Sequence, residues 1–396
     1  MLFALKISMA LIINALKTTS NLKSNSPAIS FQNETWTYAQ LASWSDQFAA
    51  HLVNDIGVKP NDIVAVHTKR SLELIGSLIA LLKIGATYLP LDADYPKLRL
   101  EYMLHQSRSQ FLITTSKMLS LNTTTDGLQK IDLDLFKVDL KNTNAFEHNQ
   151  GEHNAYLLYT SGTTGNPKGI LMGTASLAHM LEWQNAQTAL KSNSITLQFS
   201  PIGFDVHFQE IFSTLICGGH LILISEEDKI NSNRLIEVIK KHHVNRLYLP
   251  FVALNSFCET AVRTNNIPMS LREVTTAGEQ LKISPNIRKF FKSLPDISFY
   301  NHYGPTETHG IASLQLSCKS ADDIDAWPSL PTIGHPVGDC KFLILNDKME
   351  PVKTGDVVKY MRAEHVWQKA ICSMNKLLRI DLFNIATMAV FIKRET

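Results

Sequence analysis

The sequence has no clear excess of charge of either sign, no closely spaced cysteines and no long apolar run. Its 38 Lys and Arg residues are balanced by 36 Asp and Glu residues, a formal net charge of +2. This balance gives no sign of a nucleic-acid partner or of an anionic membrane surface. The lack of a Cys-x-x-Cys pair argues against a disulfide framework and a zinc site. The five cysteines are Cys217, Cys258, Cys318, Cys340 and Cys372.

No stretch of the sequence reaches the length needed to span a bilayer, so we expect no membrane partner. The scattered cysteines fit a reducing cytosol, so we expect a cytoplasmic protein. The apolar start, Met1–Leu16, carries Lys6 and lacks a small-residue cleavage pattern, which favours an amphipathic first helix over a signal peptide. A length of 396 residues suffices for two or three domains. Short apolar strands alternate with segments of helical periodicity, and this alternation predicts an α/β fold with parallel sheets covered by helices.

The stretch Leu157–Gly169 carries the most specific chemistry. Its apolar start predicts a buried strand, and hydroxyls and glycines follow before Pro167-Lys168-Gly169. Because glycine permits turns that a side chain would block, backbone N–H groups, hydroxyls and the Lys168 ammonium can face one anion. The order differs from a Walker A loop, which closes with Gly-Lys-Ser/Thr. We predict a polyphosphate site, the alternative being a plain Gly- and Ser-rich connector. Its residues are Thr160, Ser161, Gly162, Thr163, Thr164, Gly165 and Lys168.

A second motif, Asn301–Glu307, reads Asn-His-Tyr-Gly-Pro-Thr-Glu and follows a predicted strand. Its Gly-Pro pair predicts a tight turn that presents Tyr303, Thr306 and Glu307 together. An aromatic ring can lie on adenine, a hydroxyl can meet a phosphate, and a carboxylate can hold Mg²⁺. Taken alone, the motif also fits a turn followed by a helix cap.

Asp205 stands in an apolar setting at the start of a predicted helix. One interpretation is an N-cap or first-turn acid that serves the helix dipole. The other is an anchor for an ammonium group in a pocket. The sequence around Asp205 leaves both open.

The loop resembles the phosphate-binding signature of the adenylate-forming superfamily, which includes acyl-CoA synthetases, luciferases and the adenylation domains of nonribosomal peptide synthetases. Asn301–Glu307 looks like that family's Asn-x-Tyr-Gly-Pro-Thr-Glu motif, and residues 277–279 resemble the loop that borders adenine. Residues 36–41 and 82–92 are similar to the first two core motifs of the adenylation domains. The resemblance implies the N-terminal core of an adenylate-forming enzyme with a small β-barrel-like subdomain.

The same resemblance implies that an amino acid carboxylate is activated with ATP and Mg²⁺ to an aminoacyl adenylate, releasing pyrophosphate, in nonribosomal peptide biosynthesis. A peptidyl carrier protein would be the partner in the intact system. Lys168, Thr306 and Glu307 would be catalytic, Glu307 would hold the metal, and Asp205 would grip the substrate ammonium. Further nucleotide contacts would come from Gly278, Glu279, Tyr303 and Thr306. The substrate side chain would be lined by Val206, Gln209, Val252, Thr275, Ala277, His302, Gly310 and Ile311.

The motifs divide the chain into three parts. Residues 1–330 are predicted as an AMP-binding core of two α/β subdomains, residues 331–360 as a partial β-barrel subdomain, and residues 361–396 as a helical tail foreign to the family. After about Gly355 the Gly-Arg-x-Asp hinge and the catalytic lysine motif are not found, so we expect the C-terminal subdomain to be missing and turnover to be impaired. The alternatives are a stand-alone acyl or aryl acid–CoA ligase and a catalytically silent nucleotide-binding remnant.

Overall fold

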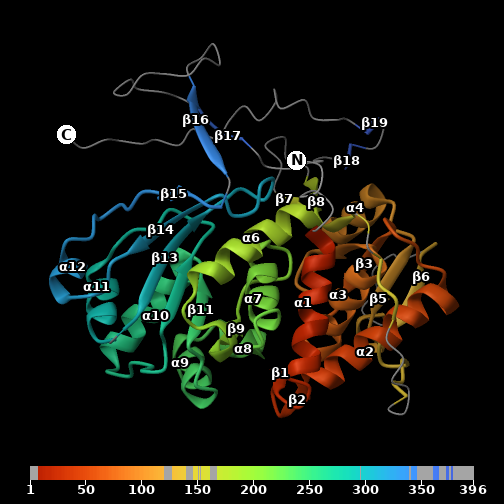
Figure 1. Ribbon diagram of the computed structural model, residues 1–396, viewed down its shortest axis with the longest axis horizontal. Helices are drawn as coiled ribbons and strands as arrows, with labels where there is room; N and C mark the ends of the chain where they lie inside the picture. The colour runs from red at the N-terminus through yellow and green to blue at the C-terminus, as the bar shows by residue number, and fades with distance from the viewer. Residues whose placement is uncertain are drawn as a thin grey trace.

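Two β-sheets lie side by side in the structure, a computed structural model, and helices cover both (Figure 1). The helices α1 and α6 run across the middle of the molecule, between the two sheets. The structure describes residues 8–119, 127–139, 146–149, 151, 153–160, 167–294, 296–338, 340–345, 360–364, 372–373 and 376–377.

The first sheet has six strands in the order β6-β5-β3-β4-β7-β8. Every neighbouring pair is parallel except β7 and β8, which form an antiparallel hairpin. The strands are β3 (Ile63–His67), β4 (Thr87–Pro90), β5 (Phe111–Thr114), β6 (Gln129–Asp132), β7 (Asn154–Thr160) and β8 (Lys168–Gly173).

The second sheet has nine strands in the order β15-β14-β13-β12-β11-β9-β10-β1-β2. From β1 to β13 the neighbours are parallel, and the antiparallel strands β2, β14 and β15 lie at the two edges. Ligands of open α/β sheets bind beyond the carboxyl ends of the parallel strands, so a site is expected at that edge. The strands are β1 (Pro27–Phe31), β2 (Glu34–Thr37), β9 (Ile195–Gln198), β10 (His220–Leu223), β11 (Arg246–Leu249), β12 (Glu273–Thr276), β13 (Ser298–Tyr303), β14 (Ala312–Leu316) and β15 (His335–Pro336).

The helices begin and end at residues that suit those positions. Thr37 and Gln40 form a reciprocal capping box at the start of α2, and Gly85 ends α3 in the left-handed conformation at φ 83°. The α-helices are α1 (Ser8–Leu22), α2 (Tyr38–His51), α3 (Leu72–Ile84), α4 (Lys97–Ser107), α5 (Ser116–Leu119), α6 (Thr174–Gln187), α7 (Val206–Leu215), α8 (Glu226–Lys229), α9 (Ser232–Lys241), α10 (Phe251–Arg263), α11 (Pro285–Lys292) and α12 (Ala321–Asp325).

Arg70 joins the carboxyl ends of the two sheets. It follows β3, and its guanidinium donates to the Gln198 side chain at 2.6 Å and to the carbonyls of Phe199 and Ser200 at 3.0 and 2.9 Å, just beyond β9. It also pairs with Glu226. Bonds from a charged donor are stronger than neutral ones, so this contact fixes how the two edges face each other.

The structure confirms the predicted α/β fold and most of the elements expected from periodicity. Three regions differ. The polar sequence of 117–153 predicts an irregular segment, but the structure has β6 there. The prolines and aspartates of 317–336 predict a connector, but that segment contains α12. Strand β1 is not predicted, because its parallel partner β10 lies far away in sequence. Long-range pairing of this kind leaves no local signal.

The two predicted parts 331–360 and 361–396 lie largely outside the described residues. Within 331–364 the structure describes β15 and the antiparallel pair β16 (Lys341–Leu345) and β17 (Tyr360–Glu364), and these described segments form no closed barrel. In the tail expected to be helical, the described residues are strands instead: the end of β17, β18 (Cys372–Ser373) and β19 (Lys376–Leu377). The other residues of 346–396 lie outside the described part of the chain.

Candidate active site

The predicted phosphate loop is the connection of the β7–β8 hairpin. Thr160, the last residue of β7, lies opposite Lys168, the first residue of β8. Residues 161–166, which include Ser161, Gly162, Thr163, Thr164 and Gly165, lie outside the described part of the chain. At the end of the loop the Tyr102 hydroxyl donates to the Pro167 carbonyl at 3.2 Å. Lys168 is exposed there, so its ammonium is open to a ligand at the carboxyl end of β7.

The second motif forms the turn between β13 and β14. The Ile311 amide donates to the Tyr303 carbonyl at 2.9 Å, and the Thr308 amide donates to the Pro305 carbonyl at 2.9 Å. Tyr303, Thr306 and Glu307 are all half-buried in this turn. Burial, and then the nearby Glu307 carboxylate, raises the pKa of Tyr303 above its usual value. The structure therefore places all three residues in one turn, as the Gly-Pro pair predicts, with Glu307 near Tyr303.

Gly304 is essential to the geometry of this turn. A Cβ atom at Gly304 would lie 1.7 Å from the His309 carbonyl oxygen, a backbone atom that cannot move aside alone. We expect Gly304→Ala to lower the free energy of unfolding by more than about 2 kcal/mol, because the backbone has to shift. Gly57→Ala is a matched control, since Gly57 has φ 88° with nothing within 4 Å of its Cβ position, so only backbone strain of about 1 kcal/mol applies. Thermal unfolding measures both, and equal losses would contradict the steric argument.

Asp205 is the N-cap residue of α7, but its side chain makes no capping hydrogen bond. The capping interpretation is thus not what the structure shows. Asp205 lies instead within electrostatic reach of Tyr156 and His309. Burial, and then the Asp205 charge, raises the pKa of Tyr156, whereas burial lowers the pKa of His309 by more than Asp205 raises it. The Tyr156 hydroxyl and His309 Nδ1 are 2.8 Å apart. A half-buried carboxylate with neutral neighbours is a suitable partner for a cation.

The remaining predicted residues lie around the same edge. Thr275 is buried in β12, Ala277 follows it half-buried, and Val206, His302 and Ile311 are buried or half-buried beside the α7 and β13–β14 segments. Gly310 lies against Gln209, because a Cβ atom at Gly310 would be 3.5 Å from Gln209 Nε2 and 2.7 Å from Met180 Cε. Met180, which no motif marks, was missed by the sequence argument.

Val252 and the adenine-loop residues lie at the surface. The Val252 side chain is 65% exposed, and its backbone amide donates to Glu279 Oε2 at 3.0 Å. Gly278 and Glu279 are exposed, with Gly278 in the left-handed conformation. Val252 thus lies next to Glu279 at the start of α10 rather than in the interior. Its assignment to the substrate pocket rests on the resemblance of Leu249-Pro250 to the family's Leu-Pro turn, and it stays a prediction.

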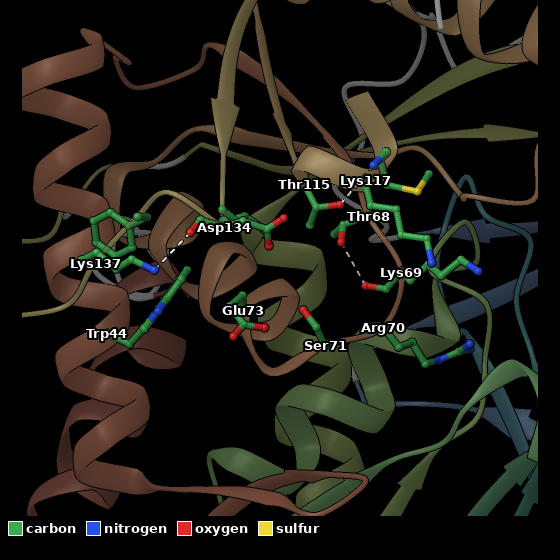
Figure 2. A pocket seen from close by; sticks show the side chains of 13 residues that line it. Trp44, Thr68, Lys69, Arg70, Ser71, Glu73, Thr115, Lys117, Asp134 and Lys137 are labelled. Atoms are coloured by element: carbon green, nitrogen blue, oxygen red, sulfur yellow. Dashed lines mark hydrogen bonds between the residues drawn. The ribbon is translucent and has the colours of Figure 1, made fainter. Parts of the chain in front are cut away.

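A hollow of about 440 Å³ lies at the carboxyl ends of β3, β5 and β6 (Figure 2), and none of the predicted site residues lines it. Figure 2 shows Lys69 and Lys117 on one side of it and Glu73 and Asp134 on the other. The Asp134 carboxylate is already bonded to the Ser116 amide at 3.0 Å. None of the described buried polar atoms without a partner belongs to its lining. Six of the fifteen such atoms among the described residues lie on α6, α7 and the β13–β14 segment.

The family profile described as "AMP-binding enzyme" matches residues 16–358. This chain belongs to the AMP-binding enzyme family. Its predicted resemblance to peptide-synthetase adenylation domains is confirmed by two relatives. Gramicidin S synthase 2 of Brevibacillus brevis is 30% identical over 324 residues, which cover 82% of this chain and 7% of that protein. Tyrocidine synthase 2 of Brevibacillus parabrevis is 31% identical over 324 residues, which cover 82% of this chain and 9% of that protein. The chain thus spans less than a tenth of these relatives.

Solved structures of this family share the fold. The AMPPNP-bound form of the nonribosomal peptide synthetase FmoA3 matches with a TM-score of 0.79 at 20% identity, over 89% of this chain and 37% of that one. The Klebsiella oxytoca NpsA N-terminal subdomain, in complex with 3-hydroxybenzoyl-AMSN, matches with a TM-score of 0.73 at 20% identity. The match covers 88% of this chain and 84% of that one. At these identities the likeness shows the fold. Among the described residues, no helix combines the length and apolar character that crossing a membrane requires.

Proposed function

We propose that this chain activates an amino acid with ATP and Mg²⁺, forming an aminoacyl adenylate for nonribosomal peptide synthesis in the cytoplasm. The observation that carries the proposal is Asp205, a carboxylate at a helix start that caps nothing and lies near the β13–β14 turn. A ligase for acids without an amino group has no ammonium for such a carboxylate to hold.

The proposed reaction needs little covalent help from the protein. One carboxylate oxygen attacks the α-phosphorus of ATP, the bond between the α-phosphorus and the bridging oxygen breaks, and pyrophosphate leaves with that oxygen. Positioning and charge stabilisation therefore dominate catalysis. In our proposal Lys168 and the loop hold the leaving phosphates, Thr306 meets the α-phosphate, and Tyr303 lies on adenine. Asp205 orients the substrate through its ammonium.

The residues present fit ATP and Mg²⁺. Mg²⁺ is usually held by one or two carboxylates together with substrate phosphates rather than by a full protein cage. This suits the half-buried Glu307, since the described residues contain no group of three His, Cys, Asp or Glu side chains that could hold a metal alone. The bound ion would neutralise phosphate charge.

A peptidyl carrier protein as the acceptor of the activated amino acid completes the proposal. One structural neighbour is an artificially fused adenylation–PCP di-domain, NpsA-ThdA.

ATP with Mg²⁺ should raise the melting temperature of the purified chain, because a ligand that binds only the folded state stabilises it. Lys168→Ala should reduce this shift, since it removes a charge-assisted contact of about 1.5–3 kcal/mol. Lys130→Ala is the matched control, because Lys130 is an exposed lysine on β6 of the same sheet. No shift at millimolar ATP, or equal effects of the two variants, would contradict the loop assignment.

A further inference from the structure

Several buried polar atoms near α6 and α7 have no hydrogen-bond partner in the described structure. Such atoms are rare in proteins, because leaving a buried donor or acceptor unpaired costs about 1–3 kcal/mol. Those that concern us are Gln184 Oε1, Gln209 Oε1 and His302 Nδ1. The residues that carry them are only 4%, 3% and 6% exposed, so bulk water does not replace the missing partners.

Contacts between α6 and α7 connect two of the three residues. The amide nitrogen of Gln184 donates to the Ser213 hydroxyl at 3.4 Å and also contacts the Tyr248 hydroxyl. The Ser213 hydroxyl in turn donates to the Gln209 carbonyl. The amide group of Gln184 is therefore fixed at its nitrogen, and its oxygen is left unpaired.

The third residue, His302, lies near Gln184 and Gln209, because residues next to it in sequence or space contact both. Its ring packs against Trp183, the residue next to Gln184, with ring centroids 5.5 Å apart. Gly310, from the turn that follows His302, lies against Gln209. We call Gln184, Gln209 and His302 the unpaired polar cluster.

The cluster begins one turn beyond the carboxylate assigned to the substrate ammonium. Asp205, Gln209 and Ser213 are four residues apart and so share one face of α7. With a rise of about 1.5 Å per residue, Gln209 lies roughly 6 Å along the axis from Asp205. A hydrogen bond covers about 3 Å of this distance, so the side chain of an amino acid held at Asp205 can reach Gln209.

The cluster is uncharged at neutral pH. Burial, and then repulsion from His309, lowers the pKa of His302 to about 4, and glutamine does not ionise. The buried charges on neighbouring elements already have partners. Arg246 and Glu273 pair with each other at 4.0 Å at the amino ends of β11 and β12, and the Glu210 carboxylate accepts hydrogen bonds from Gln198 and Ser200. A charged substrate side chain would thus lose its hydration without gaining an opposite charge among these described residues.

We propose that the activated amino acid carries an uncharged side chain that both donates and accepts hydrogen bonds, a carboxamide or a hydroxyl, which pairs with Gln209, Gln184 and His302. This inference rests on the proposed function and narrows its substrate. An aliphatic side chain of the same size would leave the cluster unpaired. A site built to bond a polar group rejects such an analogue strongly, whereas a hydrophobic pocket discriminates weakly.

The test compares matched pairs of aminoacyl sulfamoyl-adenosines by calorimetric titration into the full chain. The pairs are asparaginyl and leucyl, glutaminyl and methionyl, and threonyl and valyl, which are close in shape but differ in polarity. We expect the polar member of at least one pair to bind at least tenfold more tightly than its partner, and more tightly than the aspartyl and glutamyl analogues. Equal or tighter binding of the apolar member in all three pairs would overturn the inference.

A variant tests the residue directly. Gln209→Leu should reduce the tenfold preference toward unity, while Gln187→Leu, at an exposed position on α6, should leave it unchanged. The ATP-induced shift in melting temperature reports that each variant is folded. An unchanged preference in folded Gln209→Leu would contradict the role of Gln209. If no analogue binds, amino acid activation itself fails, which is distinct from binding without the polar preference.

Discussion

Asp205→Asn is expected to weaken binding of every amino acid substrate by about 100-fold or more while leaving ATP binding unchanged. Removing one partner of a desolvated ion pair typically costs about 3–5 kcal/mol, and partial exposure of Asp205 favours the lower end of that range. Asparagine keeps the shape of the side chain and removes its charge. Calorimetric titration of an aminoacyl sulfamoyl-adenosine measures the loss of affinity for the amino acid. Titration of ATP shows whether the affinity for the nucleotide is unchanged.

Two comparisons make the Asp205 result decisive. Asp296→Asn changes the same side chain at an exposed position before β13 and should leave affinity for the analogue unchanged. The second comparison uses the analogue without its amino group, which should bind the wild-type chain weakly and Asp205→Asn equally weakly. If the deamino acid binds the wild-type chain better than every amino acid, the acyl or aryl acid ligase is the correct assignment.

Local chemistry made much of the fold predictable from the sequence. The sequence predicts a helix capped by Thr37 and another that ends at Gly85, and α2 and α3 begin and end there. Both boundaries are predictable because capping and the left-handed conformation depend on nearby residues. The Asn301–Glu307 turn was predicted because a Gly-Pro pair has few conformations. The β7–β8 hairpin is different: a strand followed by a loop was expected, but the antiparallel return from Lys168 has no distinct local signal.

The site was predictable only where a motif marks it. Gln184 and Trp183 lie on α6 outside every motif, and they reach His302 and Ser213 only through the packing of α6 on α7 and β13. The unpaired state of a buried oxygen is a property of its whole surroundings, so no sequence pattern encodes it. Val252 shows the opposite case, since a motif suggested an interior position and the side chain is largely exposed.

A second large effect is expected at Glu210, which is fully buried on α7 and faces the end of β9. Its carboxylate accepts hydrogen bonds from the Ser200 amide at 3.0 Å, the Ser200 hydroxyl at 2.9 Å and Gln198 Nε2 at 2.8 Å. Burial nevertheless outweighs these bonds and the nearby Arg70, and it raises the pKa of Glu210 from 4.5 to about 7. The folded chain therefore holds this proton more tightly than the unfolded chain does.

The sign of the pH dependence follows from that raised pKa. Between about pH 4.5 and pH 7 the folded state binds more protons at Glu210, so stability from this group falls as the pH rises, by roughly 3 kcal/mol in all. Glu210→Gln removes the ionisation. From pH 5 to pH 8 the free energy of unfolding of the wild-type chain should therefore fall, relative to that of Glu210→Gln, by about 2.5 kcal/mol.

Buried histidines act in the opposite direction but do not obscure the comparison. Burial lowers the pKa of His207 to about 3 and of His220 to about 4, so their neutral forms favour folding above pH 6.5 and their protonation destabilises on acidification. This effect is common to both proteins and cancels in the difference. Ser200→Ala removes one donor to the ionised carboxylate, so it should enlarge the loss at pH 8. Urea unfolding at each pH measures these values, and a difference that stays constant from pH 5 to pH 8 would show that Glu210 ionises normally.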